Sequence, residues 1–221
     1  MPLSATDDPE DPLAKLAKPA AAPAAAVRLR RAYFDCSFGQ LHVRTAFPGT
    51  GGFDELVTLI CLHGAEGSSR AFATFLPEMA ATRSVYAPDL PGCGESDASP
   101  SGSAAEAARA IAELAADLRL RQIDVIGFGS GAIAALELAA ARPEQVRRLV
   151  LTQLPAQERL VNARQPALIL RSRLDGPENM TRIKGALSQA KFSESMQHEA
   201  DLFTAAPQEA AKEIDAFLSA R

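Results

Sequence analysis

The chain has 221 residues, of which 47% are hydrophobic and 23% charged, a balance typical of a globular protein and not of a disordered one. Its 23 basic and 27 acidic residues give a net charge of −4 without a long run of either sign, so we expect no nucleic-acid partner and no membrane partner. The three cysteines are too widely spaced for a disulfide framework or a CxxC metal site. We therefore expect a cytoplasmic protein with reduced thiols, no metal ion and no cofactor.

Alanine and proline dominate the beginning of the chain. Fourteen of the first 26 residues are Ala or Pro, and five scattered prolines prevent a continuous helix. We predict a flexible tail over residues 1–27 and a single domain over residues 28–221.

The first elements after this tail are predicted to be a hairpin and two buried strands. Strands over 31–35 and 40–44 are separated by a turn at Gly39. The run 56–62 is almost continuously hydrophobic, which is typical of a central strand in a parallel sheet. A helical stretch over 70–81 leads to a short strand over 84–87.

Helices and strands then alternate to the end of the chain. Ser103 and Glu106 form a capping-box pattern at the start of a helix that continues to Leu118. The later predicted strands are 123–126, 148–152 and 167–170, and the later helices are 130–141, 180–190 and 208–220. This alternation predicts an α/β fold, doubly wound, with a mostly parallel sheet and helices on both faces. Ligands bind such sheets beyond the carboxyl ends of the strands.

The strand-to-helix junction at residues 126–131, Ile-Gly-Phe-Gly-Ser-Gly, has the composition of a nucleophile elbow. Such an elbow needs small residues two positions before and two positions after its apex. An apex at Gly129 is flanked by Gly127 and Gly131, whereas an apex at Ser130 would place Phe128 at a crowded position. The sequence therefore predicts an elbow whose apex, Gly129, has no side chain. No acidic residue follows the next strand, so we do not predict a dinucleotide site.

Three motifs together carry a family resemblance. They are Leu-His-Gly at 62–64 with Gly-Ser-Ser at 67–69, the segment Ala-Pro-Asp-Leu-Pro-Gly-Cys-Gly-Glu-Ser-Asp at 87–97, and the elbow. In these motifs the chain resembles the α/β-hydrolase fold superfamily over residues 31–219. The resemblance implies that the nucleophile position falls on Gly129, the acid on Asp175, and the histidine near Asp201. No histidine stands at 200–203.

The resemblance also implies what chemistry remains. A hydroxyl attacks an ester only when an imidazole removes its proton, so Asp175 alone cannot run acyl transfer. We therefore expect a non-hydrolytic or severely impaired relative with a degenerate triad. The alternative is an active hydrolase of small esters or acyl compounds, in which Ser130 and the loop residue His198 act with Asp175. A third alternative is a structural subunit that uses its sheet edge or an exposed helix; the protein partner remains unknown.

The backbone part of the family's site does not depend on the triad. The resemblance assigns oxyanion-hole N–H groups to Ser130 and to Ala65, which follows Gly64. We expect these donors to bind a small carbonyl- or carboxylate-bearing ligand. Glu66, in the same loop, is expected to be simply solvated.

Four further expectations concern single side chains and one loop. We expect His63 to support the loop by hydrogen bonding, His42 to lie at the surface, and Cys61 and Cys93 to be structural. The fourteen residues 153–166, where many family members insert a cap, are too few for one, so the cleft is expected to be open.

Overall fold

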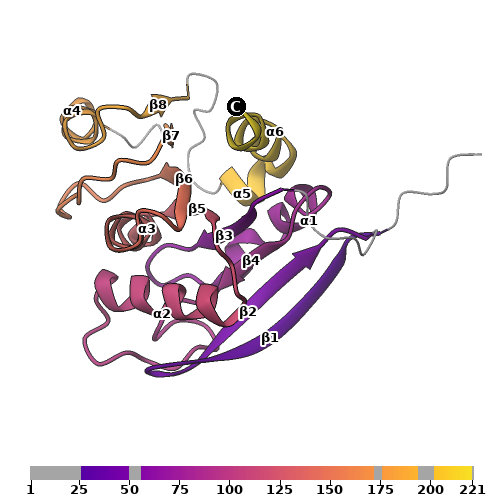
Figure 1. Cartoon of the computed structure of the whole chain (residues 1–221). Coiled ribbons are helices and arrows are strands. Elements are labelled where there is room, and N and C mark those ends of the chain that lie inside the picture. Colours follow the sequence, from indigo (N-terminus) through magenta and orange to yellow (C-terminus); the bar gives the residue numbers. More distant parts are fainter. Residues whose placement is uncertain (1–25, 50–55, 172–175, 194–201, 221) are drawn as a thin grey trace, which may run out of the picture.

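The computed structural model describes residues 26–49, 56–171, 176–193 and 202–220 (Figure 1). The predicted tail lies almost wholly outside these ranges. The elements in chain order are β1 (Arg28–Cys36), β2 (Gly39–Phe47), β3 (Thr58–Leu62), the 3₁₀ helix η2 (Ser69–Phe72), α1 (Phe75–Met79), β4 (Val85–Pro88), α2 (Ala104–Asp117), β5 (Ile123–Phe128), α3 (Ser130–Ala141), β6 (Val146–Thr152), β7 (Ala167–Leu170), α4 (Pro177–Ala186), β8 (Lys191–Phe192), α5 (Leu202–Ala205) and α6 (Pro207–Ser219).

The strands form one eight-stranded sheet in the order β1-β2-β4-β3-β5-β6-β7-β8. The pairs β1–β2 and β2–β4 are antiparallel, and all the others are parallel. The predicted hairpin and the predicted doubly wound, mostly parallel α/β fold are thus confirmed. Because β3 and β5 pair directly, the loops after Leu62 and Phe128 emerge side by side at the carboxyl ends of their strands.

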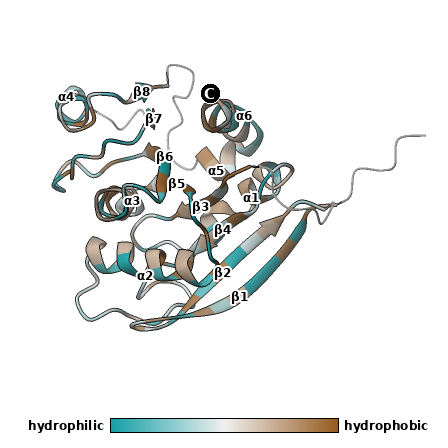
Figure 2. Ribbon diagram, viewed as in Figure 1, coloured by the Kyte–Doolittle hydropathy of each residue, from teal (hydrophilic) through white to brown (hydrophobic). Residues whose placement is uncertain are grey.

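Helices cover both faces of the sheet (Figure 1). One core contains residues of α2, α3 and α4 together with one set of strand side chains, including Ile60 and Val125. The other core contains residues of α1, α5 and α6 together with the alternate set, including Leu59 and Ile126. The central strands read as continuous hydrophobic runs because they are buried on both faces, and Figure 2 shows the hydrophobic colouring concentrated there.

Several element bounds differ from the sequence prediction. The helical stretch expected over 70–81 is divided into η2 and α1, with the break at residues 73–74. The helix expected over 180–190 begins earlier, because Pro177 occupies its first turn, where a missing N–H costs nothing. Neither β8 nor α5 was predicted, since two and four residues are too short to show a hydrophobic period.

The capping box at α2 is only half formed. The Ser103 hydroxyl accepts a hydrogen bond from the Glu106 N–H at 3.3 Å, as predicted. The Glu106 carboxylate accepts from the Ser101 N–H at 2.9 Å and so ties down the loop before the helix.

A buried ionic cluster joins the sheet to the end of α6, away from the carboxyl ends of the strands. The Asp124 carboxylate on β5 accepts two hydrogen bonds from Arg147, at 2.9 and 2.5 Å. Arg83, which is fully buried, lies 3.6 Å from Asp124 and 2.5 Å from Asp215 of α6. These contacts hold the last helix against the sheet.

Residues 153–166, between β6 and β7, contain no helix. A cap domain is therefore missing from this insertion point, as the length of the segment predicted. Within the described ranges, no helix is both long and apolar enough to cross a bilayer.

Candidate functional site

The turn between β5 and α3 has the backbone of a strained elbow. Gly129, the residue before the first residue of α3, has φ +58° and ψ −123°, a region that side-chain-bearing residues enter only at a cost. Its N–H donates to the Thr152 carbonyl at 3.1 Å, and its own carbonyl accepts from the Ala132 N–H at 3.0 Å. A Cβ added here would meet only the Gly64 Cα, at 3.3 Å, a tight contact that a shift of a few tenths of an ångström in Gly64 would relieve.

The glycines on either side of the apex lie in far more crowded positions. A Cβ on Gly127 would lie 2.5 Å from the Ala132 Cα and 2.7 Å from the Gly131 carbonyl oxygen. A Cβ on Gly131 would lie 2.6 Å from the Leu62 carbonyl carbon and would collide with the carbonyl oxygens of Leu62 and His63. These close approaches press the first turn of α3 against the end of β3.

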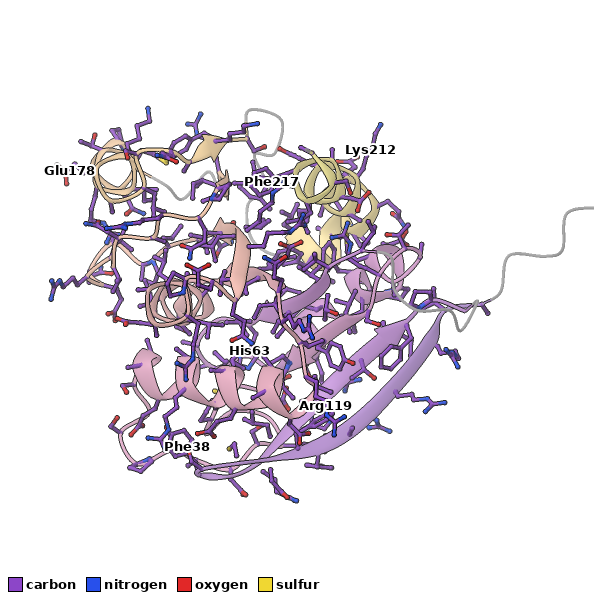
Figure 3. All side chains as sticks on the ribbon, viewed as in Figure 1. Phe38, His63, Arg119, Glu178, Lys212 and Phe217 are labelled. Carbon is purple, nitrogen blue, oxygen red and sulfur yellow. The ribbon has the colours of Figure 1, made fainter. Side chains whose placement is uncertain are left out.

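The loop after β3 is fixed by His63 and Gly64. The buried His63 ring donates from Nδ1 to the Gly64 carbonyl at 2.8 Å and accepts from the Leu90 N–H at Nε2, also at 2.8 Å (Figure 3). Both ring nitrogens are thus occupied, and the prediction that His63 supports the loop is confirmed. Burial lowers the pKa of His63, which keeps the ring neutral. Gly64 packs against the Phe128 ring, 2.9 Å from where its Cβ would lie.

Asp89 ties the loop after β4 to the loop after β3. Its carboxylate accepts from the Ser69 N–H at 2.6 Å and from the Glu95 N–H at 2.9 Å. The carboxylate also lies 2.9 Å from the Nδ1 of His42. Burial alone would raise the pKa of Asp89, but these hydrogen bonds together hold it below its ordinary value.

The expectation of a surface position for His42 is wrong. His42 is 1% exposed, because the loop after β4 covers it: Asp89 lies 2.9 Å from its Nδ1, and the Ser96 hydroxyl accepts from its backbone N–H at 2.9 Å. The sequence of β2 gave no means of distinguishing this face from the outer one, since the covering loop comes from residues far along the chain. His42 thus belongs to the support of the loops.

A cleft of about 470 Å³ opens at the carboxyl ends of β3, β4 and β5. Ala65 and Glu66 of the loop after β3 border it, as does Ser130 at the start of α3. Small and aliphatic residues from the 90–107 segment and from α3 form much of the remaining wall, namely Leu90, Pro91, Ala104, Ala107, Ile133 and Ala134. The two residues expected to supply backbone donors therefore face one cavity.

The N-terminus of α3 at this cleft favours a negatively polarised oxygen, whereas the carboxylates of Glu66 and Glu158, which border the same cleft, disfavour one. Ser130 is the first residue of the twelve-residue helix α3, so its N–H is among those that the helix leaves without an internal acceptor. The first turn of α3 contains no acidic residue that would offset the positive end of the helix dipole. Ala65, in the loop after β3, borders the same cleft.

The structure places only some of the predicted catalytic residues. Ser130 is half-buried and borders the cleft, one residue beyond the apex. Asp175, His198 and Asp201 lie outside the described residues. Where α5 begins, at Leu202 and Phe203, both side chains are buried in the core, and neither the sequence nor the structure offers a histidine there.

Two carboxylates and one cysteine also border the cleft, and one of the carboxylates, Glu158, was not predicted from the sequence. Glu66 has φ +57°, is exposed as expected, and borders the cleft. Glu158 also borders the cleft; its loop follows β6, and its position after a strand end was the only signal that could have indicated it. Burial raises the pKa of Cys93, so this cleft-lining thiol is protonated at neutral pH. Cys61 is fully buried, as expected.

A family model described as "Alpha/beta hydrolase family" matches residues 59–220 of this chain. This range begins in β3 and extends through α6, so it contains the elbow, both donor loops and the whole cleft.

Relatives of known function are similar over a shorter stretch. A pimeloyl-[acyl-carrier protein] methyl ester esterase of Neisseria meningitidis is 35% identical over 103 residues, 45% of this chain and 30% of that protein. A juvenile hormone epoxide hydrolase of Bombyx mori is 35% identical over 135 residues, 54% of this chain and 29% of that protein. The chain thus spans about a third of the length of these relatives.

Solved structures share the fold over nearly the whole chain. A thioesterase domain from the curacin biosynthetic pathway superposes with a TM-score of 0.72 at 16% identity, covering 85% of this chain and 99% of that domain. Cfl2 from Burkholderia cenocepacia gives a TM-score of 0.74 at 16% identity, covering 86% and 96%. At these identities the likeness concerns the fold alone.

Proposed function

Because this chain belongs to the alpha/beta hydrolase family, we propose that it is a non-hydrolytic or severely impaired member that retains the family's ligand cleft. The observation that carries the proposal is the residue at the elbow apex. Gly129 adopts the strained backbone of the apex and has no side chain with which to attack a substrate. An elbow without a nucleophile cannot form an acyl-enzyme.

The ligand class follows from the polar groups that remain. We propose that the N–H groups of Ala65 and Ser130 hold one oxygen of a small carbonyl- or carboxylate-bearing molecule. Support comes from their shared cavity and from the N-terminus of α3, whose first turn contains no acidic residue. The aliphatic side chains of Leu90 and Ile133 would contact the rest of the ligand.

The alternative function is hydrolysis of small esters or acyl compounds by displaced groups. One observation favours it: Ser130 borders the cleft, so its hydroxyl is near the cavity even though it is not at the apex. In this alternative His198 removes the Ser130 proton and Asp175 orients His198. The hydrolase and esterase names of the relatives are compatible with either proposal.

A pair of substitutions at Ser130 separates the backbone from the hydroxyl. Ser130→Pro deletes the N–H at the first helical position, where proline fits the helix, and Ser130→Ala deletes only the hydroxyl. With butyrate as the probe, monitored by ligand-detected NMR, Ser130→Pro should weaken binding about tenfold, the cost of one charge-assisted hydrogen bond. Ser130→Ala should bind butyrate as the parent does. Equal binding by all three proteins would refute the oxyanion-type site.

Catalysis is tested with a fluorophosphonate probe and 4-nitrophenyl butyrate. The proposal expects no labelling and no turnover by the parent protein. Labelling that disappears in Ser130→Ala would establish the alternative instead.

A restoring design tests whether the scaffold lacks only its reactive groups. Gly129→Ser combined with Asp201→His, or with Ala200→His, should produce weak esterase activity, since the added Cβ would meet one atom only, the Gly64 Cα at 3.3 Å, which a small shift of Gly64 would relieve. Gly129→Ser alone is the matched control and should remain inactive because it has no base. Inactivity of both double variants would contradict the assigned position of the base.

A further inference from the structure

β1 is an edge strand whose outer side is not covered by any other described element. It lies at one end of the strand order and is nine residues long (Figure 1). Among the described residues, the exposed large hydrophobic side chains are Leu29 and Tyr33, 57% and 52% exposed, and both belong to β1. Long edges of this kind are templates for pairing with another strand.

The hydrogen bonds of β2 show which backbone groups of β1 point outward. The His42 N–H donates to the Ser96 hydroxyl and the His42 carbonyl accepts from the Asp89 N–H, both at 2.9 Å and both on the side of β2 away from β1. His42 therefore cannot exchange hydrogen bonds with Tyr33, the residue opposite it. Hydrogen-bonding directions alternate along a strand, so Tyr33 turns its N–H and carbonyl to the outer edge.

The backbone groups of Gln40 also point away from β1. Its N–H donates to an Asp97 carboxylate oxygen at 2.8 Å and its carbonyl accepts from the Asp97 N–H at 2.9 Å, again away from β1. Gln40 lies opposite Asp35, so Asp35 also faces outward with its backbone groups. The outward set is thus Leu29, Arg31, Tyr33 and Asp35.

The set of residues with outward backbone groups restricts how a second copy of β1 could pair about a twofold axis. Antiparallel strands exchange hydrogen bonds between residues directly opposite one another, so the outward residues of one copy must face the outward residues of the other. One register places Tyr33 opposite its own symmetry mate and Arg31 opposite Asp35 of the other copy. The neighbouring register that centres on Arg31 places like charges opposite each other, and the one that centres on Ala32 forms no ion pair.

We propose that two copies of this chain pair through β1, antiparallel, with Tyr33 on the twofold axis and two symmetric Arg31–Asp35 pairs. Two eight-stranded sheets then become one continuous sheet. Cross-strand ion pairs stabilise this register, and the exposed parts of the Leu29 and Tyr33 side chains become partly covered. Each Tyr33 keeps the contacts within its own copy, where its hydroxyl donates to the Glu95 carboxylate at 2.7 Å and its ring lies 5.4 Å from that of His42. The cleft at the carboxyl ends of β3 and β5 takes no part in this interface.

Cysteine cross-linking tests the register directly. Hydrogen-bonded residues opposite each other have Cα atoms about 5.5 Å apart, which is within the range of a disulfide. Tyr33→Cys should therefore give a covalent dimer under mild oxidation. Leu29→Cys, equally exposed on the same strand, lies opposite Ser37 and should not, and the parent chain controls for its own three cysteines.

Charge reversal tests the ion pairs in solution. Arg31→Asp and Asp35→Arg each place like charges opposite each other twice, and each should raise the dimer dissociation constant by about tenfold or more in sedimentation equilibrium. The double variant Arg31→Asp/Asp35→Arg exchanges the two charges and should restore the parent value. Arg30→Asp, opposite Cys36 in this register, controls for the change of net charge.

Three outcomes would overturn the proposal. They are a monomer at all concentrations together with no selective cross-link at Tyr33, a dimer that the double variant does not rescue, and a monomer that binds an extended acidic peptide along β1.

Discussion

Replacing Gly131 with alanine tests the close packing that positions the elbow. The added Cβ would lie 2.6 Å from the Leu62 carbonyl carbon and would collide with the carbonyl oxygens of Leu62 and His63. These are backbone atoms of β3 and of the loop that carries Ala65, so they cannot be relieved by a change of rotamer. The first turn of α3 must move away from β3.

Two opposing effects set the magnitude of the change. Alanine is favoured over glycine in a helix by up to about 1 kcal/mol. Overpacking against well-packed neighbours costs about 1–3 kcal/mol, and more where backbone must shift. Because the colliding atoms are main-chain atoms of a central strand, we expect a net loss of about 3 kcal/mol, which lowers the melting temperature of a domain this size by roughly 6–12 °C.

Urea denaturation of Gly131→Ala and of Gly185→Ala measures this difference. Gly185 lies in α4, is exposed, and has no atom within 4 Å of the added Cβ, so the same substitution should leave stability unchanged or raise it by up to about 1 kcal/mol. If Gly131→Ala unfolds within about 0.5 kcal/mol of the parent, the packing argument for the elbow is refuted.

Three further predictions concern the support of the site and of the sheet. Burial lowers the pKa of His63 below its ordinary 6.5, so the unfolded chain takes up the proton first as the pH falls. The stability contribution of His63 is therefore complete above about pH 6.5 and decreases below it. Between about pH 7.5 and 5.5 the melting temperature of His63→Asn should depend less steeply on pH than that of the parent protein. Asp89→Asn keeps one acceptor oxygen but places an NH2 donor against the other backbone N–H group, and should cost about 1–3 kcal/mol in urea, whereas Asp117→Asn at the exposed end of α2 should cost little. Asp124→Ala removes a counter-ion of buried Arg83 and should lower the free energy of unfolding by about 3–5 kcal/mol, measured by calorimetry. A loss under about 1 kcal/mol would contradict a stabilising role for this ion pair.

Much of the fold could be predicted because the signals were local. Continuous hydrophobic runs marked β3 and β5, and small residues at 127, 129 and 131 marked the elbow. Short elements escaped prediction, since β8 and α5 contain too few residues to show a period. His42 was misplaced for a different reason: its burial depends on Asp89 and Ser96, which are distant in sequence.

By itself, the sequence determined the α/β class, the elbow register and the absence of a side chain at its apex, because each depends on residue type over a few adjacent positions. The tertiary structure alone decided which residues share the cleft, since Ala65, Ser130 and Glu158 come from loops on different strands that the parallel sheet brings to one edge. It alone also decided the direction of the free hydrogen-bonding groups along β1. That direction depends on which side of β2 contacts the loop after β4, where the partners of His42 lie 47 and 54 residues further along the chain.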